Sequence, residues 1–207
     1  MTEEPATQGK NADSIFAGRI DILYHLGRHY LSLPFAVLCV PVTLIAGHAP
    51  DAMPLMPLLL QMAVVIAAEQ LTTAYTNRKP GSDPHFWARR YTFGSAISGA
   101  TWGVASLFWF VWDSFPAQAY LCLAFLGMAA TEFIARSAYR PAYLAHTVFA
   151  LGPLVALLLV QGGLYATLAA VLIVLFAAVL ASYCNSMAHL LDETIYLRNE
   201  NGELVIK

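Results

Sequence analysis

The feature that most constrains this chain is a series of six apolar stretches separated by short polar segments. The stretches occupy residues 31–47, 55–76, 91–112, 117–135, 142–161 and 164–184. Most of them approach the roughly 20 residues that a helix needs to cross a hydrocarbon core about 30 Å thick. The composition, 58% hydrophobic and 12% charged over 207 residues, is far from that of a soluble domain. The sequence therefore predicts an all-α polytopic membrane protein with six transmembrane helices.

All eleven Lys and Arg residues fall on one side of this pattern. They precede the first stretch, follow the sixth, or lie in the segments 77–90 and 136–141. The loops on the other side carry Asp51 and Asp113 but no basic residue. Because basic residues collect in cytoplasmic loops, we expect a multi-pass protein with both termini in the cytoplasm. The basic residues follow the topology and form no patch of the kind that binds nucleic acid, so no nucleic-acid partner is expected.

The third stretch has small residues at four-residue spacing, Ser95, Gly99 and Gly103. Such spacing lets a second helix approach closely, which matters in a bilayer because lipid offers no hydrophobic drive for helix association. We therefore expect the third stretch to form a central helix of the bundle.

The segments on either side of the six stretches predict three parts of the chain. Residues 1–13 are polar and acidic, which indicates a flexible cytoplasmic tail. Residues 14–30 place apolar side chains at three- and four-residue spacing, as in a helix that lies in the membrane interface. Together with the six spans, this helix makes one membrane domain over residues 14–186.

Residues 187–207 keep a helical period after the last apolar stretch ends. The heptad core positions are Met187, Leu190, Thr194, Leu197, Asn201 and Leu204. A parallel homodimer is the simplest way to cover such a stripe, and a core Asn favours two strands in one register. Gly202 weakens the coiled coil, since a helix-interior Gly costs about 1 kcal/mol relative to Ala. The alternative is a single helix that merely leaves the membrane; the coiled coil would connect to a cytoplasmic output domain outside this chain.

Four runs of sequence carry a family resemblance. They are ARRYTFGSAISGATWGVA at 88–105, LGMAA at 126–130, AYRPAY at 138–143 and IYLRNEN at 195–201. Together they resemble the six-helix N-terminal membrane sensor region of bacterial signalling proteins. In that family the region precedes a diguanylate cyclase, often with a phosphodiesterase domain, or a histidine kinase. The resemblance implies an input module in the bacterial cytoplasmic membrane that regulates c-di-GMP or kinase signalling. No catalytic motif of those enzymes is present, so this segment is not expected to be an enzyme.

Three ionisable residues lie at membrane depth in the cytoplasmic half, Glu69, Glu132 and His146. A charged group there costs roughly 2.5–3.5 kcal/mol, so all three are expected to face protein rather than lipid. Glu132 and Arg136 are four residues apart, a spacing that lets them pair on one helix face. With Trp102 these residues are the candidate binding site for a small hydrophobic ligand or a quinone. The alternative is a hydrogen-bonded cluster that only supports the fold.

Histidines suggest a haem or metal site near the same face. Bis-histidine haem sites take one ligand from each of two helices, and His29 with His146 is the best-placed pair. His25 and His189 are the substitutes. The alternative is interfacial placement for His25 and His189, and a hydrogen-bonded core histidine at 146.

Two other functions compete with a sensor module. Glu69, Glu132 and His146 at membrane depth would also suit a small transporter or channel, although no internal repeat supports one. Haem bound by the histidines would make the chain a b-type cytochrome-like redox protein.

Overall fold

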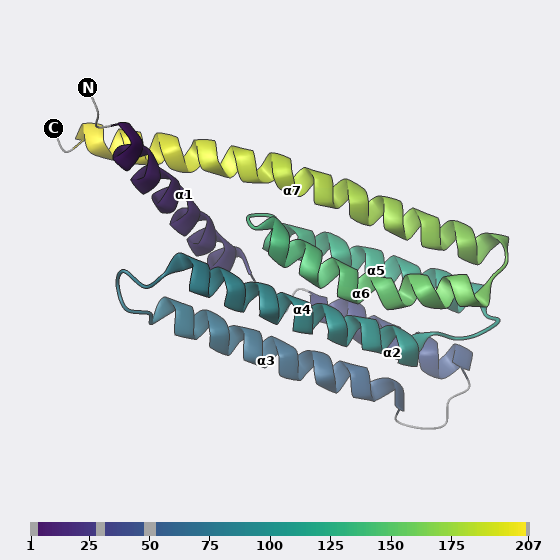
Figure 1. The fold of residues 1–207 in the computed structure, drawn as a ribbon. Helices are drawn as coiled ribbons and strands as arrows, with labels where there is room; N and C mark the ends of the chain where they lie inside the picture. The colour runs from purple at the N-terminus through teal and green to yellow at the C-terminus, as the bar shows by residue number, and fades with distance from the viewer. Residues whose placement is uncertain (1–3, 28–31, 48–52, 206–207) are drawn as a thin grey trace.

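The computed structural model describes the backbone of residues 4–27, 32–47 and 53–205, and the side chains of 13–27, 32–45 and 53–197. This part of the chain is all-α, and its seven α-helices are joined by short turns (Figure 1). The helices are α1 Glu4–Leu26, α2 Leu33–Gly47, α3 Met56–Thr76, α4 Pro84–Trp109, α5 Phe115–Arg136, α6 Arg140–Gln161 and α7 Leu164–Val205. A 3-10 turn, Met53–Leu55, leads into α3.

Four segments are long and apolar enough to cross a membrane, as a multi-pass membrane protein requires. They are Met53–Thr76, Phe115–Arg136, Arg140–Gln161 and Leu164–Leu197, and the most apolar 18 residues of each have a mean hydropathy between 1.4 and 2.7. The sequence predicts six such spans, whereas by length and composition the described residues give four. The expected span at 31–47 forms only the 15-residue α2, which is about 22 Å long. The expected span at 91–112 belongs to α4, which begins with polar and basic residues and is rich in small ones.

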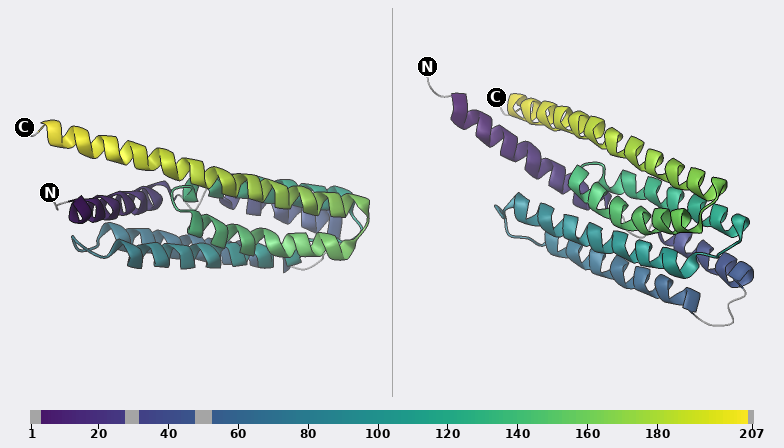
Figure 2. Two further views of the ribbon diagram at one scale, coloured as in Figure 1. Left: turned by 45° about the horizontal axis from the view of Figure 1, so that its top comes forward. Right: turned by 45° about the vertical axis from the view of Figure 1, so that its right-hand side comes forward.

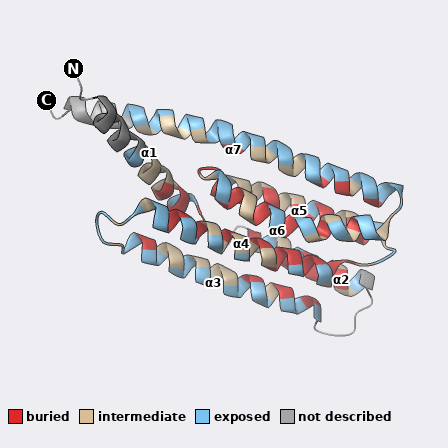
Figure 3. Ribbon diagram, viewed as in Figure 1, coloured by how far each residue is buried: buried red, intermediate tan, exposed pale blue. Residues whose placement is uncertain are grey.

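Helices α2 to α7 lie side by side as an elongated bundle (Figures 1 and 2). The closest neighbours are α4 and α6, followed by α6 with α7, α3 with α4, and α2 with α5. Buried apolar side chains of α2, α4, α5, α6 and α7 form one continuous core. Burial is dense along α4 and α5, and α4 packs along both α3 and α6, whereas α3 and α7 expose most of their surface (Figure 3). Helix α4 is therefore central, as the sequence predicts.

Two glycines set the spacing between α4 and α6. A Cβ added at Gly99 would lie 2.2 Å from the carbonyl oxygen of His146, and one at Gly103 would lie 2.3 Å from that of Phe149. No side chain fits at either position, so the backbones of the two helices are in contact. The predicted role of the small residues in this stretch is confirmed.

Helix α1 leaves the bundle at an angle and lies beside the C-terminal part of α7, at what we call the proximal end of the bundle (Figure 1). It begins at Glu4 and ends at Leu26, so the prediction of a flexible tail over 1–13 and a helix over 14–30 places the boundaries wrongly. Polar residues before residue 14 continue the helix because nothing in them breaks it; residues 1–3 and 28–31 lie outside the described residues.

Helix α7 is continuous over 42 residues, about 63 Å at 1.5 Å per residue. The predicted sixth span and the predicted connector are thus one helix. Its C-terminal part extends past the proximal ends of α5 and α6 (Figures 1 and 2).

Candidate ligand site at Arg136

A buried ion pair lies at the proximal end of α5. The side chains of Glu132 and Arg136 form a salt bridge one helical turn apart, as their spacing predicts. Arg136 is 0% exposed and Glu132 is 3% exposed. The Arg136 Nε donates a hydrogen bond to Ser95 Oγ of α4 over 3.1 Å. Since an unpaired buried charge costs about 3–5 kcal/mol, the carboxylate is what allows this guanidinium to be buried.

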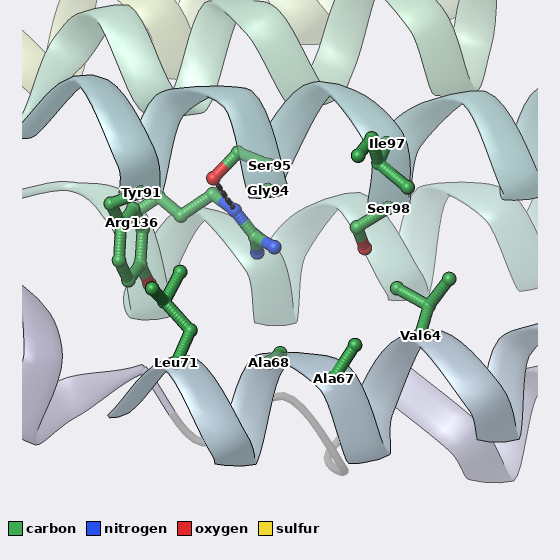
Figure 4. Close-up of a pocket in the computed structure, with 10 residues that line it drawn as sticks. All are labelled: Val64, Ala67, Ala68, Leu71, Tyr91, Gly94, Ser95, Ile97, Ser98 and Arg136. Atoms are coloured by element: carbon green, nitrogen blue, oxygen red, sulfur yellow. Dashed lines mark hydrogen bonds between the residues drawn. The ribbon is translucent and has the colours of Figure 1, made fainter. Parts of the chain in front are cut away.

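A cavity of about 100 Å³ opens between α3 and α4 beside this pair. Its wall consists of Val64, Ala67, Ala68, Leu71, Tyr91, Gly94, Ser95, Ile97, Ser98 and Arg136. The α3 side is apolar, and its alanines leave the space open. The guanidinium enters from the α4 side and directs its nitrogens toward α3, with Tyr91 beside it (Figure 4). The arrangement joins an apolar cleft to a strong hydrogen-bond donor.

The structure brings together two of the five predicted ligand residues, Glu132 and Arg136. Glu69 was expected to face the interior, but it lies on an exposed face of α3, so that prediction is wrong. The apolar period of α3 is too weak to tell its two faces apart, since apolar residues surround the helix.

Trp102 and His146 lie in the core between helices. Trp102 packs edge-to-face on Phe125, with ring centroids 5.3 Å apart, and its buried indole N–H has no hydrogen-bond partner within the described residues. His146 is fully buried, and its Nε2 lies 3.4 Å from the Met128 sulfur. Neither residue contributes to the wall of the Arg136 cavity.

The haem and metal hypothesis gains no support from the histidines that the structure describes. His25 and His189 are both exposed, and the His25 ring meets the carbonyl oxygen of its own helix at Asp21 over 2.8 Å. Iron at His146 Nε2 would have to displace the Met128 sulfur. His29 lies outside the described residues, and within those residues no three His, Cys, Asp or Glu side chains come together as a metal site.

An ionic network at the proximal end was not anticipated from the sequence. Asp21 of α1 accepts a hydrogen bond from the Tyr75 hydroxyl at 2.5 Å and from Arg78 Nη2 at 2.7 Å. Two residues earlier, Arg19 makes a paired, fork-like contact with Asp192 of α7 through Nε and Nη2. We call these contacts the proximal clamp; through α1 they join α3 to α7.

Close packing reinforces the clamp. A Cβ added at Gly18 would lie 3.2 Å from Ile195 Cδ1, so α1 touches α7 next to the ion pair. Tyr24 stacks on Tyr75 with ring centroids 3.8 Å apart and donates its hydroxyl to the carbonyl oxygen of Trp87 over 3.1 Å. Burial raises the pKa of the Tyr24 hydroxyl well above its usual range, so this donor keeps its proton. The only signal in the sequence was an acid and a base two residues apart on one helix.

The predicted heptad stripe of α7 is exposed in the single chain. Met187 is 38%, Leu190 58% and Leu197 50% exposed, and Thr194 is exposed as well. Helix α1 packs on a different side of α7, around Asp192 and Ile195. The side chains at heptad positions 201 and 204, Asn201 and Leu204, lie outside the described residues, although the helix continues through both.

Comparison of the chain with protein-family models, curated proteins and solved structures finds no match. The resemblance to bacterial sensor regions therefore stays a prediction.

Proposed function

We propose that this chain is a membrane-embedded sensory input and dimerisation module of the bacterial cytoplasmic membrane. It would detect a small ligand and pass its state through α7 to a cytoplasmic output enzyme of the diguanylate cyclase or histidine kinase class. The observation that carries the proposal is the continuous α7, 42 residues long, which is packed in the bundle at one end and held by the proximal clamp further along.

In this proposal α2 and α4 cross the membrane together with the four apolar helices. Helix α4 packs along α6 and α3, so it has to follow them through the bilayer. Its low hydropathy comes partly from small and polar residues that are buried against other helices, such as Ser95, Gly99 and Ser106. Six crossings then put the basic loops, both termini and the proximal end on the cytoplasmic side.

The path from the site to the output runs through contacts between named residues. Leu71 lines the Arg136 cavity and packs against the aromatic cluster at the end of α3 that contains Tyr75. Tyr75 and Arg78 hold Asp21, and Arg19 on the same helix holds Asp192. A shift of α3 caused by a ligand in the cavity would thus move α1 and, through it, α7.

Dimerisation through α7 is supported by the exposed stripe at Met187, Leu190, Thr194 and Leu197. Exposed apolar residues in a polar helix segment are best covered by a second copy of the same stripe, as in a parallel coiled coil. The stripe lies beyond the continuous apolar stretch at 164–184, among polar and charged residues, where lipid would not cover it.

The transporter alternative was based on Glu69, Glu132 and His146 at membrane depth, and the cytochrome alternative on paired histidines. Glu69 is exposed and Glu132 pairs with Arg136, so of the three residues that suggested a transporter only His146 is buried outside that ion pair. The best-placed histidine pair of the cytochrome alternative includes His29, which lies outside the described residues.

A change of helix phase tests the proposal. A diguanylate cyclase reporter is fused behind Lys207, and residues are inserted in α7 after Leu197, downstream of the clamp. At about 100° per residue, two inserted residues turn the downstream helix by about 200°, whereas seven return it to within about 20° of its original phase. We expect the two-residue insertion to change cyclase activity in membranes strongly and the seven-residue insertion to keep it close to that of the parent. Equal effects of the two insertions, in either direction, would show that α7 does not transmit a state as a rigid helix.

A further inference from the structure

The Arg136 cavity has a chemical character that narrows the class of its ligand. This inference rests on the proposed function, because it assigns a ligand to the site that the module would read. Four polar residues line the cavity, Arg136, Ser95, Tyr91 and Ser98, and the first three are each at most 2% exposed. The remainder of the wall is formed largely by alanine, valine, leucine and isoleucine side chains.

The shape selects an amphipathic molecule. Helix α3 presents Val64, Ala67, Ala68 and Leu71 to the cavity, so the part of the ligand between the two helices has to be apolar. The guanidinium reaches into the space from the α4 side (Figure 4). A polar atom of the ligand would therefore meet Arg136 while its apolar body extends outward between α3 and α4.

The hydrogen-bonding groups select an acceptor. A guanidinium offers only donors, and it carries more N–H groups than the contacts with Ser95 and Glu132 use. Within the described residues these are the acceptors that Arg136 meets. An oxygen acceptor of the ligand would satisfy the remaining N–H groups at the cavity.

The charge balance excludes a strongly anionic group. Glu132 already neutralises Arg136, so the buried pair has no net charge. A carboxylate or phosphate would bring an uncompensated negative charge into a poorly solvated site, which is costly, whereas a carbonyl oxygen would not. We propose that the cavity binds an uncharged amphipathic molecule through a carbonyl oxygen, such as the head group of a quinone or the acyl ester of a membrane lipid.

Binding to the full chain purified in detergent tests the inference, with native mass spectrometry as the readout. The probes are a short-chain benzoquinone, an uncharged diacylglycerol, its diether analogue without carbonyl groups, and a fatty acid. Ala68→Phe fills the cavity, and Ala63→Phe places the same side chain on an exposed position of α3 as the matched control. Gly94→Ala is a milder second variant, because its added methyl group meets Leu71 Cδ2 at 3.7 Å, an ordinary contact.

We expect at least one carbonyl probe, the benzoquinone or the diester lipid, to bind both the parent protein and Ala63→Phe. If the diester lipid binds, it should bind more tightly than the diether lipid. Binding should fall roughly tenfold or more in Ala68→Phe, and less in Gly94→Ala, because the variants close the cavity and remove the contact with Arg136. Which of the two probes binds identifies the source of the carbonyl. Three results would overturn the inference: no binding of either carbonyl probe, or lipid binding alone that is equal for diester and diether; preference of the parent for the fatty acid; and binding that is indifferent to Ala68→Phe.

Neutralising the carboxylate provides an independent test. In Glu132→Gln the guanidinium loses its counter-charge, so the site becomes cationic. We expect this variant to bind the fatty acid more tightly than the parent does and to discriminate less in favour of the neutral carbonyl probe. An unchanged order of preference would contradict the charge argument. These binding experiments do not depend on the cyclase reporter. If the ligand binds in the cavity but the insertions in α7 have no effect on cyclase activity, the ligand site stands and the sensory function is rejected.

Discussion

The contact between α4 and α6 makes a quantitative prediction for Gly99→Ala. The new Cβ would lie 2.2 Å from the carbonyl oxygen of His146, whereas ordinary van der Waals contacts begin at 3.4 Å. The helices would have to separate locally by about 1 Å, the difference between these distances. Backbone cannot rotate away as a side chain can. We therefore expect the free energy of unfolding to fall by about 1–3 kcal/mol, the range for overpacked cores, with loss of dispersion contacts along the interface as a further cost.

The assay is unfolding of the purified protein in mixed micelles of increasing dodecyl sulfate content, followed by tryptophan fluorescence. Gly152→Ala is the matched control, because a Cβ at that position in α6 meets nothing within 4 Å. The control should be unchanged or more stable by up to about 1 kcal/mol, since Ala favours helix over Gly. If Gly99→Ala were as stable as Gly152→Ala, the close approach of α4 and α6 would be refuted, and with it the argument that α4 follows α6 across the membrane.

Two further predictions follow from single contacts. Reversing the ion pair of the clamp, Arg19→Asp with Asp192→Arg, should recover most of the unfolding free energy that each single substitution loses. The coupling energy in a double-mutant cycle should be about 1 kcal/mol, because the pair is partly exposed. Additive losses would exclude the ion pair. Trp109→Phe should lower the free energy of unfolding by about 1 kcal/mol more than Trp102→Phe does. The reason is that the Trp109 indole N–H donates to the carbonyl oxygen of Pro54 over 2.9 Å, whereas the Trp102 N–H has no such partner within the described residues. Equal losses would contradict this expectation.

Local patterns in the sequence predict the parts of the fold that depend on neighbouring residues. The apolar stretches predict where the helices lie, the spacing of Gly99 and Gly103 predicts the close approach of α4, and Glu132 with Arg136 predicts an ion pair on one helix face. Each of these signals lies within one helix, where spacing alone determines which side chains share a face.

Features formed between distant segments could not be predicted in this way. The clamp joins Arg19 to Asp192, which are 173 positions apart, and no periodicity connects them. The orientation of Glu69 was missed because apolar residues surround α3, so burial in the bundle cannot be told from contact with lipid. The cavity could not be predicted for a related reason. Nothing in the sequence distinguishes Ala67 and Ala68 from other helix residues, because the cavity exists only where α3 lies opposite Arg136.

The central claim, that the state of the Arg136 cavity reaches a dimeric α7, can be tested by an intermolecular distance measurement. A spin label is attached at Glu193→Cys, an exposed position on α7, in protein reconstituted in lipid nanodiscs. The native Cys39, Cys122 and Cys184 are buried and should react little with the label. We predict a defined distance distribution between two copies by double electron–electron resonance, which shifts when Ala68→Phe fills the cavity and stays in place in Ala63→Phe. A lack of intermolecular coupling, or a distribution that is the same with the cavity open and filled, would contradict the account.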